Sequence, residues 1–406
     1  MTDVMQGVRI LEVAEHTFVP AASAILAEYG AEVIKIEHVE RGDAMRGLAS
    51  SGTVPLSDGA HVLLEHSNRG KKSLGLDLTA EAGIDILYRL AKTSDVFLHN
   101  KLPRVRKKLR IGLDDIRAQN PDIIYVSGGG QGERGPDADK GSYDSLAYWA
   151  RASVASSLTP PDSEQMPTPP GPAFGDSIGA MTIAGGIMGA LFHRERTGEA
   201  TTVDVSLLSA GMWSMGATIA ISLQHQMPWR GRPKDMPNRN PLAGNYRTKD
   251  GRFISLTCLQ AGKYWAEAVA VAGRPELAND ERFCDAGAIA ENAAAGVEML
   301  AEAFAERTLD EWREALENFS GQWAVVQDNI EVADDPQAKA NGYVQHYESG
   351  EGHPFTLVSP PVQYGGKPAT PRRAPAFNEH GDDILQEVLG IDYEQIIELK
   401  LQNVIP

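Results

Sequence analysis

Asp176 is the residue whose setting points most directly to chemistry. It stands immediately before an uncharged run, Ser177 to Phe192, that contains four glycines. Glycine costs about 1 kcal/mol relative to alanine inside a helix, so this run predicts a buried helix packed very closely against another backbone. Asp176 then falls at the N-cap, where unpaired N–H groups and the helix dipole favour an anion. It is either an ordinary cap or a carboxylate nucleophile or base, with backbone N–H groups nearby for an oxyanion.

Ser177 is a second candidate nucleophile. Residues Gly175 to Gly179 fit the G-x-S-x-G pattern of the serine-hydrolase elbow, which needs a buried strand before it and a helix after it. The preceding segment holds six prolines between Thr159 and Gly175, and proline cannot donate to a central strand. A hydrolase would also need a downstream acid and a histidine, for which His353 and His380 are the candidates.

Two further motifs suggest a bound nucleotide or polyanion. Gly130 to Gly135 (GQGERG) matches G-x-G-x-x-G, but Pro136 follows where a dinucleotide site needs a helix, so a turn lining a pocket is the better interpretation. Lys101 to Arg110 holds six cations in ten residues, and Asn68 to Lys72 adds three more. Such clusters are typical either of a phosphate-bearing ligand or of a solvated helix face.

The whole chain sets limits on class and compartment. Its net charge of −17 over 406 residues disfavours a nucleic-acid or anionic-membrane partner. Cys258 and Cys284 are too few for a disulfide framework or thiolate metal site, and the histidines show no metal-ligand spacing. The start of the chain does not resemble a signal peptide. The uncharged run from Val205 to Leu223 predicts a buried or interface helix, and we expect a cytoplasmic protein without a metal.

The N-terminal part alternates between strand-like and helix-like segments. Strand patterns cover Val8–Val13, Glu32–Val39, Ser73–Leu78, Asp95–His99 and Asp122–Ser127, and helical periodicity fills segments such as Ala21–Tyr29 and Ala80–Lys92. This alternation predicts a parallel sheet covered by helices. Ligands of such sheets bind at the carboxyl ends of the strands, so the loops after Val13, Val39, Asn100 and Ser127 are the ones to watch.

Proline-rich segments divide the rest of the chain. A connector with four prolines covers 224–245, and a compact α+β segment follows over 246–346. A third proline-bearing stretch, Pro354 to Pro375, leads to a helical tail from Asp382 to Leu401. The sequence alone therefore predicts an α/β protein of two or three domains.

Several motifs together resemble those of the family III CoA-transferases (the CaiB/BaiF family). This family includes formyl-CoA transferase and carnitine CoA-transferase, with α-methylacyl-CoA racemase as a relative. The resemblance runs nearly end to end and rests on GVRILEV, LAEYGAEVIKIEHVERGD, NRGKKSLGLDL, GGGQGERGP, GDSIGAM, HRERTGEATTVDVSLLSAG, DPQAKANGYV and NEHGDDIL.

The resemblance implies that Asp176 attacks an acyl-CoA thioester, giving an aspartyl-acyl anhydride and then an aspartyl-CoA thioester, before a carboxylic acid acceptor takes up the CoA. An acyl-CoA racemase or epimerase is the alternative, but that branch has histidine where Tyr143 stands. An unperturbed tyrosine pKa of about 10 makes Tyr143 a poor proton exchanger at neutral pH. A non-enzymatic CoA-binding protein would tolerate a change at Asp176.

The resemblance also implies CoA contacts and an assembly. CoA would be a substrate rather than a tightly bound cofactor, contacted by Thr17, Phe18, His38, Leu76, Asp77, Leu78, Thr79, Asn100, Lys101, Leu102, Lys108, Gly141, Ser142, Tyr143 and Asp144. His38, Thr17 and Lys101 depart from common family choices, and the absence of a glycine run after Pro241 disfavours formyl or oxalyl specificity.

The fold implied by the resemblance is a Rossmann-like large α/β domain over 1–223, completed by a C-terminal return over 347–406. The connector at 224–245 leads into the inserted small α+β domain, 246–346. Members of the family form interlocked homodimers, so the implied partners are acyl-CoA, a carboxylic acid acceptor and a second copy of the chain.

Overall fold

The computed structural model describes residues 3–52, 54–56, 59–231 and 239–406, and its chain forms two compact units. The first comprises Met1–Gly231 with Pro336–Pro406, and the second comprises Arg232–Asp335. The second unit starts earlier and ends earlier than the predicted 246–346. Strand β9 (Ala243–Arg247) already pairs within it, whereas 336–346 packs with the first unit. Part of the predicted connector, 232–238, lies outside the described residues.

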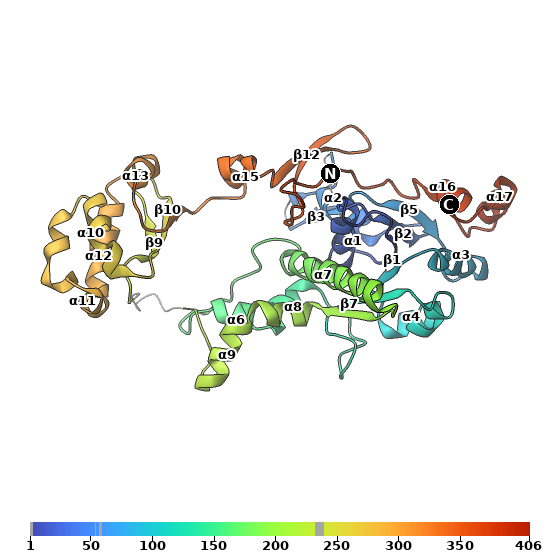
Figure 1. The fold of residues 1–406 in the computed structure, drawn as a ribbon, viewed down its shortest axis with the longest axis horizontal. Helices are drawn as coiled ribbons and strands as arrows, with labels where there is room; N and C mark the ends of the chain where they lie inside the picture. The colour runs from blue at the N-terminus through green and yellow to red at the C-terminus, as the bar shows by residue number, and fades with distance from the viewer. Residues whose placement is uncertain (1–2, 53, 57–58, 232–238) are drawn as a thin grey trace. The chain divides into compact units, whose positions relative to one another are not determined.

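A six-stranded parallel sheet forms the centre of the first unit (Figure 1). Its strands are β1 (Arg9–Val13), β2 (Glu32–His38), β5 (Lys72–Leu76), β6 (Val96–His99), β7 (Ile124–Gly129) and β8 (Thr202–Ser206). They lie in the order β5-β2-β1-β6-β7-β8, which is the Rossmann-like order with a switch point between β1 and β6. The predicted α/β class is confirmed, although β8 was not foreseen as a strand.

Helices cover both faces of this sheet. Helices α1 (Phe18–Glu28) and α7 (Phe174–Thr197) share one hydrophobic core, to which β1, β6 and β7 also contribute. The opposite core contains α3 (Glu81–Lys92) together with the C-terminal segment, including α17 (Tyr393–Leu401). The C-terminal residues also complete the outer edge of the sheet, because the N–H of Asp77 donates to the carbonyl of Val404 at 2.9 Å.

Helix α7 is long and apolar enough by length and composition to cross a membrane, yet here it is a core helix. Gly179 and Gly186 fit the predicted close packing, since an added Cβ would lie 2.3 Å from the Phe18 ring and 2.8 Å from Val203, respectively. Within this chain the same prediction is not met at Gly185 and Gly189. Both are exposed, with open space where a Cβ would stand.

The uncharged run at 205–223 does not form the single helix that was predicted. It supplies the end of β8 and then two helices, α8 (Leu207–Ser214) and α9 (Gly216–His225). Ser206 caps α8 with a hydrogen bond from the N–H of Ser209 at 2.9 Å. This cap starts α8 at Leu207, and Met215 separates it from α9.

Shorter elements complete the first unit. They are α2 (Val62–Asn68), α4 (Pro103–Leu109), α5 (Leu113–Arg117), α6 (Val154–Leu158), α15 (Pro336–Ala340), α16 (Gly381–Asp383), the π-helical turns Ser145–Arg151 and Ile384–Val388, and the β-hairpins β3 (Ser50–Ser51) with β4 (Val54–Pro55) and β12 (Val344–Glu348) with β13 (Pro354–Val358).

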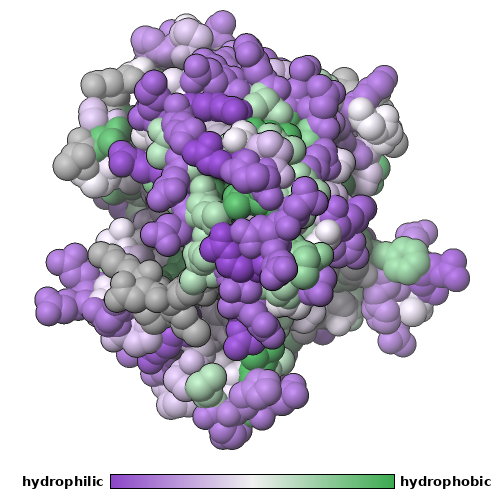
Figure 2. Space-filling model, turned by 90° about the vertical axis from the view of Figure 1, so that its left-hand side faces the viewer, coloured by the Kyte–Doolittle hydropathy of each residue, from purple (hydrophilic) through white to green (hydrophobic). Residues whose placement is uncertain are grey.

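The second unit is an α+β domain with its own core. An antiparallel sheet in the order β11-β10-β9 joins β9, β10 (Phe253–Thr257) and β11 (Trp323–Val325). It packs with α10 (Ala261–Val271), α11 (Ala286–Glu291), α12 (Ala293–Phe304) and α13 (Leu309–Leu316), and α14 (Glu331–Asp334) follows. Figure 2 shows a mostly hydrophilic surface with hydrophobic residues in small separate patches.

Candidate active site

A cavity of about 690 Å³ opens at the carboxyl ends of the sheet strands, around the switch point between β1 and β6. This is where ligands of open parallel sheets bind. The cavity brings together most of the predicted site residues: Phe18, His38, Leu76, Asp77, Leu78, Thr79, Asn100, Lys101, Leu102, Lys108, Gly141, Ser142, Tyr143 and Asp176. Other residues that line it come from the loops predicted after Val13, Val39 and Ser127, namely Glu15, His16, Arg41, Gly128 and Gly129. Leu207 also lines it and was not predicted.

Thr17 and Asp144 are the predicted residues that do not line the cavity. Thr17 is buried directly before α1. Asp144 instead supports α7, since its carboxylate accepts a hydrogen bond from the N–H of Gly175 at 3.3 Å. Phe18 bridges the cavity and the helix, because its ring packs against Gly179.

Asp176 is not the N-cap of α7, contrary to the sequence prediction. The helix begins at Phe174, so Asp176 is its third residue, and the preceding Ala173 has a left-handed backbone with φ of 59°. Asp144 supplies the carboxylate that a cap would have provided. As a result, no hydrogen bond or ion pair joins the Asp176 side chain to any other residue that the structure describes. The Asp176 side chain faces the cavity.

The environment of Asp176 disfavours its charged form. Burial, and secondly the negative charge of Asp144, raise the pKa of Asp176 from 3.8 to about 7. The carboxyl group is therefore poised to exist in both protonation states near neutral pH. A carboxyl group with this pKa in a cavity is a candidate nucleophile or base.

The backbone N–H groups around Asp176 are largely committed. The N–H of Ser177 donates to the carbonyl of Ala173 at 2.9 Å, and that of Gly175 donates to Asp144. The N–H of Asp176 itself makes no hydrogen bond to a described residue, so it is the donor left for the expected oxyanion.

The Ser177 hydrolase is not supported by this geometry. Its hydroxyl donates to the carbonyl of Ala173 at 2.9 Å, which is ordinary bonding within a helix. His380 lies against Ser73, at 3.4 Å from the backbone N–H, and His353 pairs with Glu351 at 3.6 Å. Neither histidine lines the cavity with Asp176.

Glu15 organises the cations of the cavity. Its carboxylate pairs with Lys101 at 2.5 Å and with Arg41 at 3.1 Å. Burial opposes ionisation of Glu15, but Lys101 and Arg41 outweigh it and hold its pKa below the usual range. Asn100 also binds this loop, because its amide donates to the Glu15 carbonyl at 2.7 Å. Lys108 lines the cavity without an ion pair to a described residue.

The basic segment from Asn68 to Lys72 does not contribute to a polyanion site, contrary to expectation. Arg69 pairs with Glu28 at 3.2 Å, Lys71 with Glu12 at 2.8 Å and Lys72 with Glu32 at 2.8 Å. These cations stabilise the fold and none lines the cavity.

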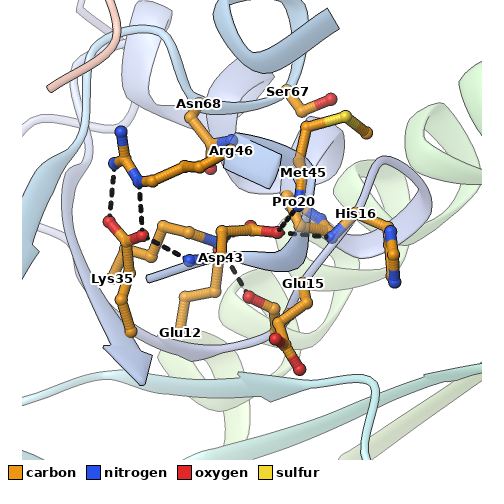
Figure 3. A network of polar contacts seen from close by, with 12 residues as sticks. Glu12, Glu15, His16, Pro20, Lys35, Asp43, Met45, Arg46, Ser67 and Asn68 are labelled. Atoms are coloured by element: carbon orange, nitrogen blue, oxygen red, sulfur yellow. Dashed lines mark hydrogen bonds and ion pairs between the residues drawn. The ribbon is translucent and has the colours of Figure 1, made fainter. Parts of the chain in front are cut away.

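A buried ion network fixes the loop that follows β1 (Figure 3). The Lys35 ammonium, which is fully buried, pairs with Glu12 at 2.8 Å and Asp43 at 2.7 Å and also donates to the carbonyl of Ala14 at 2.7 Å. Asp43 in turn accepts hydrogen bonds from the N–H groups of His16 at 3.0 Å and Met45 at 2.9 Å. Sequence periodicity could show these strands but not a network among side chains 31 residues apart.

Comparisons with known proteins show the family of the chain. The model of CoA-transferase family III matches residues 5–381. The (R)-2-hydroxy-4-methylpentanoate CoA-transferase of Clostridioides difficile is 31% identical, over 99% of each chain. The cinnamoyl-CoA:phenyllactate CoA-transferase of Clostridium sporogenes is 29% identical, over 98% of this chain and 96% of the relative. A crystal structure of a CaiB/BaiF family protein from Brucella suis has a TM-score of 0.78 and 25% identity, over 95% of this chain and 99% of that one.

Proposed function

The chain belongs to CoA-transferase family III, and from that premise we propose that it moves CoA between two carboxylic acids through covalent intermediates on Asp176. One observation carries the proposal: the Asp176 carboxyl group faces the cavity, is unpaired among described residues and has a pKa raised to about 7. A carboxylate that makes no hydrogen bond and no ion pair is available to attack a carbonyl carbon.

The proposed steps balance without a net proton. A carboxylate oxygen of Asp176 attacks the thioester carbonyl, the C–S bond breaks, and CoA thiolate leaves an aspartyl-acyl anhydride. The thiolate attacks the aspartyl carbonyl and releases the first acid as its carboxylate. The acceptor carboxylate then displaces thiolate from the aspartyl-CoA thioester, and the thiolate attacks the acceptor carbonyl to release the new acyl-CoA and free Asp176.

Different residues of the cavity suit the two ends of an acyl-CoA. Lys108 follows β6, and His38 is the last residue of β2; these two groups suit the phosphates of CoA. Asp176, Gly128 and Leu207 come from α7 and from the β7 and β8 side, and they suit the acyl group.

The charge around Asp176 supports monocarboxylic acids as the acyl groups. Asp144 adds a second negative charge nearby, and Lys101 and Arg41 are already paired with Glu15. A second substrate carboxylate would therefore lack a free cation near Asp176. The names of the two relatives above each include a 2-hydroxy acid with an apolar side chain, 2-hydroxy-4-methylpentanoate and phenyllactate, the latter paired with cinnamoyl-CoA, and we assign this class to the present enzyme.

We also propose that the enzyme is a cytoplasmic homodimer. Its described cysteines are both free. Large apolar side chains on α7, α8 and α9 are exposed on the single chain: Ile178, Phe192, Met212, Trp213, Ile221 and Leu223. A second copy would cover them, and light scattering coupled to size-exclusion chromatography should give twice the chain mass.

Intact-protein mass spectrometry tests the covalent route. After incubation with 2-hydroxy-4-methylpentanoyl-CoA, the wild type should gain an adduct that hydroxylamine removes and that maps to Asp176. Asp176→Ala should gain none, while Asp162→Asn, a change at an exposed carboxylate, should behave as wild type. An adduct on Ser177, or loss of the α-proton to deuterated water without any adduct, would contradict the proposal.

A further inference from the structure

His16 has a backbone conformation that needs support. Its φ is 69°, in the left-handed region that few residues other than glycine adopt. Asp43 accepts the His16 N–H at 3.0 Å, while Lys35 holds both Asp43 at 2.7 Å and the Ala14 carbonyl at 2.7 Å. Lys35 and Asp43 are fully buried. Two buried charges thus fix the loop on either side of one strained residue.

The strained backbone directs the His16 side chain to the cavity. In Figure 3 the ring turns away from the ion network that holds its own backbone. The ring lines the cavity and meets the Tyr143 ring edge-on, with centroids 5.8 Å apart. Neither ring nitrogen bonds to a residue that the structure describes, so the imidazole is left to bind something else. Strained backbone conformations are found mainly at active sites and ligand contacts, and here buried charges hold such a conformation in the wall of the cavity.

A short series of contacts links His16 to the segment that carries Asp176, and both residues line the same cavity. Tyr143, which the His16 ring touches, directly precedes Asp144, and Asp144 accepts from the N–H of Gly175 next to Asp176. Two residues after His16, the ring of Phe18 packs against Gly179, which lies one helical turn beyond Asp176.

The surroundings determine which chemical group His16 can bind. Lys101 and Arg41 are paired with Glu15, and Asp144 is negative, so a second carboxylate is disfavoured at this place. A neutral hydroxyl can both donate to and accept from an imidazole. We propose that His16 hydrogen-bonds the 2-hydroxyl group of the bound acyl chain and so determines the enzyme's preference for 2-hydroxy acids. This inference rests on the proposed function.

The test separates binding from covalent chemistry. In an Asp176→Asn background, which cannot form the anhydride, we would measure the dissociation constants of 2-hydroxy-4-methylpentanoyl-CoA and 4-methylpentanoyl-CoA. The hydroxylated ligand should bind about tenfold more tightly, and adding His16→Ala should abolish that ratio. Adding His16→Asn should retain part of it, because asparagine tolerates the left-handed backbone and keeps a hydrogen-bonding group.

Each outcome supports or overturns the assignment. A partial loss of folding would weaken both ligands by the same factor and could not by itself abolish the ratio, so an abolished ratio supports the contact with His16. A ratio that persists in His16→Ala overturns the inference. If Tyr143→Phe rather than His16→Ala abolishes the difference between the two dissociation constants, Tyr143 binds the 2-hydroxyl group and the inference is wrong. The adduct experiment on the wild type tests the proposed function separately. If the adduct forms on Asp176 but the ratio of dissociation constants does not depend on His16, only the role of His16 is rejected.

Discussion

The rate at which acyl-CoA acylates Asp176 should rise with pH through a midpoint near 7. Only the carboxylate form attacks, and burial together with Asp144 raises the pKa of Asp176 to about 7. About one molecule in ten is then ionised at pH 6 and about nine in ten at pH 8, so the rate should change roughly tenfold. An aspartate with the ordinary pKa of 3.8 would be ionised at both values and would show no such change.

Asp144→Asn is the perturbation that tests the cause. The amide oxygen of asparagine can still accept from the N–H of Gly175, but the negative charge is gone. The midpoint should therefore move below 7. It should stay above 3.8, because burial is the larger cause of the raised pKa and remains.

Quenched-flow measurements of the acyl adduct by intact mass, in single-turnover conditions from pH 5.5 to 8.5, would give these midpoints. Asp162→Asn controls for removing one exposed negative charge and should keep the wild-type midpoint. A wild-type rate that is flat across this range would refute the raised pKa. A midpoint that does not fall in Asp144→Asn would refute the role of that charge.

Three other substitutions test the fold and the cavity. Lys35→Met leaves the buried carboxylate of Asp43 without an ion pair and Glu12 with Lys71 as its remaining cation, and should lower the free energy of unfolding by about 3–5 kcal/mol in urea titrations. Gly179→Ala places a Cβ 2.3 Å from an aromatic ring and should lower the free energy of unfolding by about 1–3 kcal/mol. Lys108→Ala should weaken CoA binding and flatten its salt dependence in calorimetry. Lys107→Ala, an adjacent exposed lysine outside the cavity, should do neither.

Much of the sheet could be predicted because buried parallel strands are continuous apolar runs. Five strands were expected at the places where β1, β2, β5, β6 and β7 lie. Strand β8, TVDVS, was missed because its last two residues, Val205 and Ser206, were assigned to the uncharged run that was predicted as a helix. Asp176 was found because a lone carboxylate before a glycine-rich run is a local signal.

The parts of the site that escaped prediction depend on contacts between distant segments. Asp144 takes the capping role from 31 residues away, which no pattern around Asp176 reveals. Glu15 and His16 gain their settings from Lys101, Asp43 and Tyr143. A left-handed backbone at His16 has no composition signal, since histidine occurs in every kind of structure.

The edge of the sheet affects the order in which the two units can complete their folds during synthesis. Strand β5, whose end supplies Leu76 to the cavity, is bordered by the last residues of the chain: Asp77 bonds to the Val404 carbonyl, and the Gly75 N–H bonds to the Asn378 side chain at 2.9 Å. Val404 and Ile405 are buried in the core beside it. On the ribosome this edge stays open until residues 378–405 have been made, whereas the second unit is complete by Asp335. A nascent chain can therefore complete its inserted unit before the sheet edge beside the cavity is closed.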